Sequence, residues 1–299
     1  HCVLPAPGMA ETCAEMIYVT AGGETGRHLG AIVVPLLIHD LPVMLWWPAE
    51  PEWRSEQARA LLRVTDRLVV DGSGWPGDGL ERLVGMARVA REEHLVVADF
   101  GLVRQARWRE AIASVFDLPE FQPFLRAVDR IVIDYAAADD VDADASTNIV
   151  KPVYHAAWLG SRLDMTVVEP LHPVPEGGRC ATLGRARGTV EVRLRPVASS
   201  MPGGTTLRVE IQAERRGRRL LGEVTAEQET VDVRLRENGD VRLERSFLAP
   251  RQREVDLLSQ VIEDFGRDPV AAETLEMAAA LAAPDGAGQG RHSHRRPPR

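Results

Sequence analysis

Lysine is almost absent from this chain of 299 residues, and Lys151 is its only example, so arginine supplies nearly all of the 36 basic residues. A nucleotide-binding loop of the Walker type needs Gly-Lys-Ser or Gly-Lys-Thr, whereas this lysine lies between valine and proline. The 44 acidic residues give a net charge of −8, and neutralising nucleic-acid phosphates requires a basic surface. The composition therefore argues against Walker-type hydrolysis and against a dedicated nucleic-acid binder.

Cysteine is also scarce, because Cys2, Cys13 and Cys180 are too few and too scattered for a disulfide framework or a closed zinc site. This pattern indicates a reducing compartment, and we expect a cytoplasmic protein. The most hydrophobic region, residues 29–47, is broken by proline, histidine and aspartate, so it lacks the roughly 18 unbroken apolar residues of a membrane span. We expect no signal peptide, and because the chain opens at His1 we expect an upstream region to have been removed.

Sequence signatures of catalysis and of metal binding are missing as well. Neither Gly-x-Ser-x-Gly nor His-Glu-x-x-His occurs. The aspartates at 139, 140, 142 and 144 lack the glycine and the closing glutamate of a calcium loop, so we interpret them as a solvated loop. The isolated histidines are not spaced as ligands: His28, His39, His94, His155 and His172. We therefore expect no catalytic residue, no metal ligand and no bound cofactor.

Short β-branched runs alternate with helix-like stretches through the first half of the chain, which is typical of βαβ units. We predict strands at 16–19, 42–47, 67–71, 95–98, 129–135 and 165–168, and helices near 27–38, 55–64, 78–93, 107–116 and 146–163. With right-handed crossovers, these elements predict an α/β fold with a Rossmann-like, mostly parallel, doubly wound sheet. This domain is expected to span residues 1–172.

A strict period of two begins near Thr189 and predicts antiparallel strands with one solvated face. After these strands, an amphipathic helix places Val255, Leu258, Ile262 and Phe265 on one face, and an alanine-rich helix follows. We therefore expect an antiparallel β domain with C-terminal helices over residues 173–283. The tail at 284–299 has no periodicity and is predicted to be disordered.

The Asn-Gly pair between the last two predicted strands leaves two registers open. A two-residue loop sets Leu235 opposite Arg242. A three-residue loop with a left-handed glycine sets Leu235 opposite Val241 and Val233 opposite Leu243. We predict the second register, because it keeps one face apolar.

The segment Gly72-Ser73-Gly74-Trp75-Pro76-Gly77 matches a dinucleotide fingerprint and follows a predicted strand. In a true fingerprint the third glycine packs inside the first helical turn, whereas Gly77 precedes Asp78, the expected N-cap. Pro76 also removes a backbone donor where a phosphate would need one. We interpret the segment as a tight loop without a ligand. The alternative is a Rossmann-like enzyme that uses this loop in a redox or sugar-nucleotide reaction, with Asp99 or His94 as acid or base.

Residues 40–48 end a predicted strand in two adjacent indoles, Trp46 and Trp47. Side chains alternate along a strand, so these two must face opposite sides of the sheet. One is expected in the core, and the other toward the second layer or the rim above the strand, where open α/β sheets place their functional surface. No nucleophile, base or metal ligand adjoins them, which favours binding over catalysis.

A second candidate surface begins where another predicted strand ends, with Arg104, Trp108 and Arg109. Tryptophan beside arginine is typical of a protein interface. An equally weighted alternative is that Trp108 packs its helix onto the sheet while Arg109 pairs with a nearby acid. We retain Trp46, Trp47, Arg104, Trp108 and Arg109 as partner-binding candidates. A regulatory module that senses a sugar phosphate is a further alternative, with Arg104 and Arg109 holding the phosphate.

These segments together resemble the glucose-6-phosphate dehydrogenase assembly protein family, OpcA. The resemblance covers about residues 2–281 and rests on the order and spacing of 40–48, 64–67, 108–110 with 116–117, 154–163 and 251–253. Phe100 stands where the family usually has a tryptophan, and the family's usual N-terminal region is missing. The resemblance implies a non-catalytic protein that binds glucose-6-phosphate dehydrogenase and promotes its active oligomer or conformation. It also implies that this protein supports NADPH production in the oxidative pentose phosphate pathway.

Overall fold

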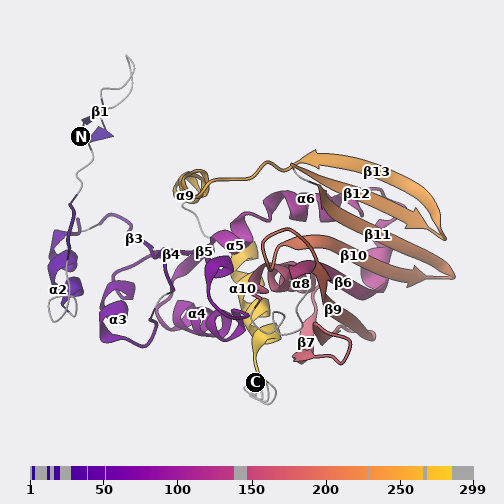
Figure 1. Ribbon diagram of the computed structural model, residues 1–299, viewed down its shortest axis with the longest axis horizontal. Helices are drawn as coiled ribbons and strands as arrows, with labels where there is room; N and C mark the ends of the chain where they lie inside the picture. Colours follow the sequence, from indigo (N-terminus) through magenta and orange to yellow (C-terminus); the bar gives the residue numbers. More distant parts are fainter. Residues whose placement is uncertain are drawn as a thin grey trace, which may run out of the picture.

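In the part of the chain that the structure describes, the computed structural model contains three β-sheets (Figure 1). The first pairs β1 (Cys2–Val3) with β2 (Thr12–Cys13), the second has three parallel strands, and the third has eight strands. No helix in the described part of the chain is long and apolar enough to cross a membrane. The structure describes residues 2–3, 12–13, 17–20, 28–38, 40–50, 52–137, 147–227, 229–264 and 268–284.

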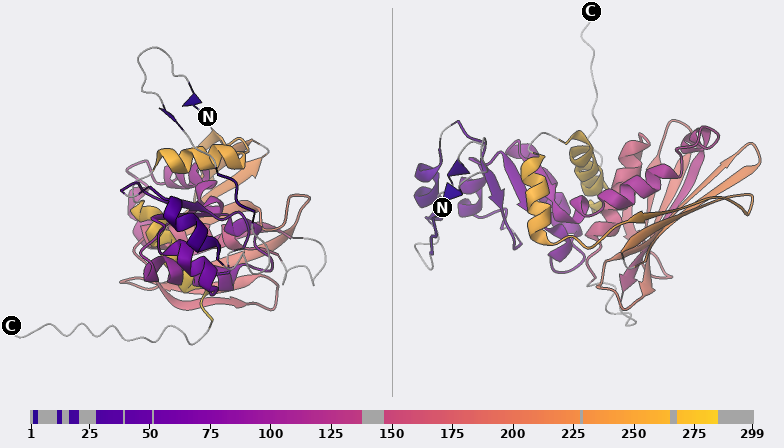
Figure 2. Two further views of the ribbon diagram at one scale, coloured as in Figure 1. Left: turned by 90° about the vertical axis from the view of Figure 1, so that its left-hand side faces the viewer. Right: turned by 90° about the horizontal axis from the view of Figure 1, so that it is seen from above.

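The three-stranded sheet is covered by helices on both faces. Its strands, in spatial order, and its helices are β3 (Met44–Trp46), β4 (Arg67–Val70), β5 (Val96–Asp99), α3 (Glu56–Leu62), α4 (Leu80–Glu92) and α9 (Glu254–Glu263). Leu68 and Val70 of β4 belong to the main core with residues of α3 and α4, whereas Val69 packs with Leu257 of α9. Alternate residues of a strand point to opposite faces, so β4 is buried between two layers. Figure 2 shows α9 lying across this small sheet.

The eight-stranded sheet has one helix-covered face and one charged face. In spatial order its strands are β13 (Asp240–Leu248), β12 (Thr230–Glu237), β11 (Arg218–Glu227), β10 (Thr206–Arg215), β6 (Val128–Ala137), β9 (Thr189–Ala198), β8 (Arg179–Gly184) and β7 (Thr166–Pro173). Neighbouring strands are antiparallel except β6 and β9, which are parallel. Val190, Val192 and Leu194 of β9 are buried, while Arg208 pairs with Asp134 on the other face. The predicted alternation with one solvated face is confirmed.

The remaining helices connect the sheets and cover the larger one. Among the described residues they are α2 (Leu29–Val33), η1 (Val34–Leu36), η2 (Gly72–Gly74), α5 (Phe100–Val103), α6 (Ala106–Ser114), η3 (Gln122–Ala127), α8 (Val150–Arg162) and α10 (Pro269–Ala282). Helix α8 packs on β6, β9 and β10, and α6 packs on β11, β12 and β13. Helix α10 contacts both α4 and α8, and therefore links the layers of the two sheets.

Two strands predicted for the parallel sheet belong to the larger sheet instead. The strand predicted at 129–135 is β6, which pairs with β9 and β10, and the strand predicted at 165–168 begins β7 at the edge. A buried β-branched run is similar in a parallel and in a mixed sheet, so the choice of neighbours depends on contacts far along the chain. Residues 17–20 have no regular structure, although a strand is predicted at 16–19. The division at residue 172 stays a prediction. His39, residues 139–144, Phe265 and the tail after 284 lie outside the described residues.

The hairpin between β12 and β13 has a two-residue Asn-Gly loop, with φ of 52° and 95°. A bulge near Arg242 then sets Leu235 opposite Leu243. The predicted pairs of Leu235 with Val241 and of Val233 with Leu243 are wrong. Asparagine and glycine both accept positive φ, so the loop needs no third residue, and the bulge keeps leucine facing leucine on the covered side.

Helix α9 packs on a face different from the one that its sequence pattern suggests. Leu257 and Val261 are buried against the small sheet. Val255 and Ile262 are 56% and 53% exposed, and Leu258 is half-buried between the two faces. The helix therefore carries two apolar stripes, and only one of them is covered.

Candidate functional site

The two adjacent tryptophans at the end of β3 face opposite sides of the small sheet. Trp46 is in register with Val69, so it points toward α9, and it is 40% exposed. Its ring centroid lies 6.5 Å from that of the buried Phe100. The backbone N–H of Trp47 donates to the carbonyl of Val69 at 2.8 Å, and the indole packs against the main core. The prediction that the two indoles separate is confirmed, and Trp46 is the more accessible of the pair.

The uncovered stripe of α9 lies on the same side of the small sheet as Trp46. Gln260 and Asp264 line a cavity beside β5, so the opposite flank of α9 faces β3. Val255, Leu258 and Ile262 occupy that flank, because residues three and four apart lie on one side of a helix. We call Trp46, Val255, Leu258 and Ile262 the Trp46 patch. The sequence pattern places Val255, Leu258 and Ile262 on one face of the helix. The sequence also contains a second apolar stripe, Leu257 and Val261, and a helix that covers this stripe leaves the first one exposed.

Arg104 borders the Trp46 patch at the carboxyl ends of the parallel strands. Its guanidinium lies 5.7 Å from the centroid of the Phe100 ring, which is a cation–π arrangement. The same group donates to Oδ2 of Asp71, which follows β4, at 2.7 Å. Trp46, Phe100 and Arg104 thus form a row across the ends of the sheet. Because Asp71 neutralises Arg104, this side chain is poorly suited to hold a phosphate.

Asp99 joins three segments in the interior. Its Oδ1 accepts from the N–H groups of Gly72 and Gly101 at 3.0 and 2.7 Å, and its Oδ2 accepts from the hydroxyl of Tyr154 at 2.7 Å. The side chain is buried, and this burial raises the pKa of Asp99 to about 6 despite the three hydrogen bonds. A Cβ atom at Gly72 would lie 2.5 Å from Oδ2 of Asp99. Glycine is needed there for the approach of this carboxylate.

The glycine-rich loop is filled by side chains of the protein itself. The amide of Asn148 donates to the carbonyls of Gly72 and Trp75, both at 2.9 Å. The N-cap of α4 is Gly79 rather than the predicted Asp78, whose Oδ1 accepts from the N–H of Leu80. Gly79 has a positive φ of 79°, which glycine adopts readily, and α4 begins at the next residue, Leu80. These bonds fit the interpretation of a tight loop without a ligand.

Trp108 and Arg109 of α6 point inward. The ring of Trp108 lies 5.1 Å from that of the buried His155, which places this tryptophan between α6 and α8. Arg109 donates to the carbonyl of Leu102 at 2.7 Å, and burial lowers the pKa of its guanidinium. The structure therefore places Trp46 and Arg104 together at the surface. Trp47 and Trp108 are partly buried against the main core, and Arg109 lines a cavity.

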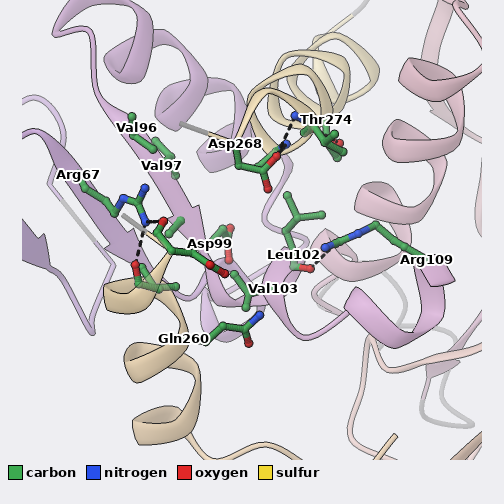
Figure 3. A pocket seen from close by; sticks show the side chains of 15 residues that line it. Arg67, Val96, Val97, Asp99, Leu102, Val103, Arg109, Gln260, Asp268 and Thr274 are labelled. Carbon is green, nitrogen blue, oxygen red and sulfur yellow. Dashed lines mark hydrogen bonds between the residues drawn. The ribbon is translucent and has the colours of Figure 1, made fainter. Parts of the chain in front are cut away.

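That cavity lies beside β5, between α9 and α10, and has a volume of about 110 Å³ (Figure 3). Arg67 donates to the carbonyls of Val261 and Asp264 at 2.8 and 2.7 Å, so it caps the end of α9. Two guanidinium groups, of Arg67 and Arg109, share the cavity with the carboxylates of Asp264 and Asp268. Since one water occupies about 30 Å³ of liquid, the space suits a few waters and is too small for a nucleotide. Among the described residues, no group of three or more histidine, cysteine, aspartate or glutamate residues is arranged to hold a metal ion.

Two family models match most of this chain. One, described as glucose-6-phosphate dehydrogenase subunit N-terminal domain, matches residues 2–86, and the other, described as the C-terminal domain of the same subunit, matches residues 95–275. A Nostoc punctiforme protein named OxPP cycle protein OpcA is 29% identical over 154 residues, which are 51% of this chain and 30% of that protein. A Synechocystis protein of the same name is 28% identical over 156 residues, which are 52% of this chain and 30% of that protein. The matched part is thus under a third of each relative.

Solved structures give only distant similarities. An aldose-aldose oxidoreductase from Caulobacter crescentus has a TM-score of 0.47 and 11% identity, with 85% of this chain and 80% of that chain covered. A UDP-N-acetylglucosamine 3-dehydrogenase from Acidithiobacillus ferrooxidans has a TM-score of 0.38 and 16% identity, with 87% and 94% covered. Similarities of this size say nothing about the activity of this chain.

Proposed function

This chain belongs to the OpcA family of glucose-6-phosphate dehydrogenase assembly proteins, and we propose that it binds that dehydrogenase in the cytoplasm and promotes its active state. It does so without catalysing a reaction itself. The product of this action is a greater supply of NADPH from the oxidative pentose phosphate pathway.

The exposed Trp46 patch is the observation that carries this proposal. Three of its members, Trp46, Val255 and Ile262, are between 40% and 56% exposed, although all are large and apolar. Exposed apolar side chains gathered on one surface typically mark an interaction site. Tryptophan and arginine also dominate the energetics of protein interfaces, and Arg104 lies at the edge of this patch. The patch therefore supports binding to a partner protein.

Differential binding is the mechanism that such a surface permits. A partner that prefers one state of an enzyme shifts the population by its difference in affinity alone. A preference of about 100-fold corresponds to roughly 2.7 kcal/mol, which is enough to make a minor state the dominant one. We therefore propose that the Trp46 patch contacts the dehydrogenase more favourably in its active arrangement.

The positions of the acid–base candidates support a non-catalytic role. Asp99 is buried, and both of its oxygens accept hydrogen bonds from the protein. His94 is exposed and precedes β5, whereas Asp99 ends it, so these residues lie at opposite ends of one strand. Arg104 and Arg109 also bond to different partners and do not form a joint phosphate clamp.

A binding and activity assay tests the proposal. Purified chain is mixed with purified glucose-6-phosphate dehydrogenase, complex formation is followed by size-exclusion chromatography, and NADPH formation is followed by absorbance. We expect co-elution and faster NADPH formation, and both should be lost in the variant Trp46→Ser/Ile262→Ser. The matched control is Val241→Ser/Val197→Ser, which removes two comparably exposed residues from the larger sheet. Unchanged kinetics together with separate elution of the unmodified proteins would overturn the proposal.

A further inference from the structure

A second surface hollow lies away from the Trp46 patch, between α6, η3 and α8, and has a volume of about 880 Å³. No residue of β3 or α9 lines it. We call it the α6–α8 groove.

The floor of the α6–α8 groove is apolar. It is formed by Ile112, Phe116, Leu125, Trp158 and Leu163, of which Leu125, Trp158 and Leu163 are only partly buried. These side chains lie in or directly after α6, η3 and α8; Ile112 and Phe116 belong to the main core, and the other three pack against it. An apolar floor with open space above it suits the apolar face of another helix.

The rim of the groove has a surplus of positive charge, although the chain as a whole has a net charge of −8. Two of its charged residues are already paired, because Arg162 contacts Glu273 of α10 and Asp117 contacts Arg245 of β13. Arg126 and Arg215 remain. Neither has a carboxylate within ion-pair distance among the residues that the structure describes.

The turn between β10 and β11 adds to this charge. Arg215 ends β10 and lies directly opposite Arg218 of β11, and like charges in this position destabilise a hairpin. Arg218 has Glu237 as a partner, whereas Arg215 faces the groove. Arg216, in the turn itself, is exposed and also lacks an ion-pair partner within the described ranges. An acidic ligand in the groove would relieve this repulsion.

From this arrangement we propose that the α6–α8 groove binds an acidic amphipathic helix of the partner protein. Its apolar side chains, spaced at three and four residues, would cover Trp158 and Leu163. Its carboxylates would pair with Arg126 and Arg215, and guanidinium–carboxylate pairs are among the stronger charged hydrogen bonds. The inference rests on the proposed function, because the dehydrogenase supplies the helix, and it adds a contact surface separate from the Trp46 patch.

Ala113 permits a test that depends on the sign of a charge. It is exposed on α6 and lines the groove, and both glutamate and arginine are good helix formers, so neither substitution disturbs the fold. The affinity of the full chain for purified glucose-6-phosphate dehydrogenase is measured by surface plasmon resonance. We expect Ala113→Glu to weaken binding by at least about tenfold, which corresponds to 1.4 kcal/mol, whereas Ala113→Arg should bind as tightly as the unmodified chain or more tightly.

A charge reversal on the rim provides the second measurement. Arg126→Glu/Arg215→Glu should weaken binding by at least about tenfold, and the control Arg54→Glu/Arg187→Glu, at exposed arginines elsewhere, should change it less than about twofold. Raising the salt concentration should weaken the unmodified complex more than the reversed variant, because added ions screen the attraction. Thermal melting confirms that each variant is folded.

The outcomes separate the two proposals. If the unmodified chain binds the dehydrogenase but Ala113→Glu and Ala113→Arg bind with equal affinity, the groove proposal is wrong and the Trp46 patch stands. If all groove variants bind normally while Trp46→Ser/Ile262→Ser does not, the same conclusion holds. If the unmodified chain does not bind at all, both proposals are overturned together.

Discussion

The hydroxyl of Tyr154 donates a hydrogen bond of 2.7 Å to the carboxylate of Asp99, and this contact joins α8 to the end of β5. The same carboxylate accepts from Gly72 and Gly101, so one buried side chain holds a strand end, a loop and a helix together. Hydrogen bonds to charged groups contribute about 1.5–3 kcal/mol each. The contact therefore connects the small parallel sheet to the helix layer of the larger sheet.

Asp99 should make the protein less stable as the pH rises from about 4 to 6. Its pKa is about 6 in the folded chain and near the ordinary 3.8 when unfolded. A raised folded pKa stabilises the fold below the unfolded value, and that stability is lost as the pH rises through the folded value. The difference amounts to about 3 kcal/mol. His155 changes the stability in the opposite sense over the same range, and it does so equally in both proteins, so the unmodified chain is compared with Asp99→Asn. Measured by urea unfolding, the free energy of unfolding of the unmodified chain relative to Asp99→Asn should fall by about 3 kcal/mol from pH 4 to pH 6, and a constant difference would contradict the assignment.

His155 should act with the opposite sign and over a wider range. Its ring is buried beside Trp108, and neither nitrogen has a hydrogen-bond partner among the described residues. Burial lowers the pKa of His155 from 6.5 to about 3, so the fold holds the neutral ring. The resulting stability is present above pH 6.5 and is lost as the pH falls toward 3, by about 5 kcal/mol in total.

Replacing His155 with leucine tests this sign. Removing a buried polar group that has no partner should leave the free energy of unfolding at pH 7 unchanged or higher, and acid unfolding should move to lower pH. The midpoint is measured by tryptophan fluorescence during acid titration. The control His28→Gln, at an exposed position, should not move the midpoint. An acid midpoint that stays in place in His155→Leu would show that another group controls it.

Local patterns in the sequence were enough to predict most elements but not their neighbours. The strands β4 and β5 and the helices α4 and α8 appear close to where apolar periodicity predicts them, and the alternation in β9 and β10 identifies their covered face. The pairing of β6 with β9 joins residues about sixty positions apart, and nothing local encodes it. The same reason explains the missed register of the last hairpin, since a bulge shifts the pairing without changing the pattern.

The candidate site was predictable to a similar extent. Alternation alone separates Trp46 from Trp47, and strand ends locate the row that includes Arg104. The inward position of Trp108 depends on His155, which lies in a helix far along the chain. The sequence alone therefore could not decide whether Trp108 is an interface residue or packs its helix onto the sheet. The central role of Asp99 was also hidden, because its partners Gly72 and Tyr154 lie 27 and 55 positions away.

Gly72 should tolerate no side chain, whereas Gly74 should. A Cβ at Gly72 would lie 2.5 Å from Oδ2 of Asp99 and 3.2 Å from Val150, while a Cβ at Gly74 would meet no atom within 4 Å. Overpacking of this kind destabilises by about 1–3 kcal/mol. Gly72→Ala should therefore lower the free energy of unfolding by that amount, as measured by urea denaturation. Gly74→Ala is the matched control and should be neutral or slightly stabilising, because alanine restricts the unfolded chain. Equal effects at the two positions would count against the close packing around Asp99.

Arg67 should couple the stability of α9 to partner binding. It is buried in β4, and its guanidinium donates to the carbonyls of Val261 and Asp264 at the end of that helix. Arg67→Met removes both bonds but keeps an apolar side chain of similar length, and it should raise hydrogen exchange in α9 by the equivalent of about 1.5–3 kcal/mol. The affinity for the dehydrogenase should fall with it, because Val255 and Ile262 lose their fixed position. Arg253→Met is the control, since its ion pair with Asp256 lies at the start of the same helix, is exposed to solvent and contributes little to stability. If α9 exchanges faster in Arg67→Met while the affinity stays the same, then α9 is not part of the binding surface.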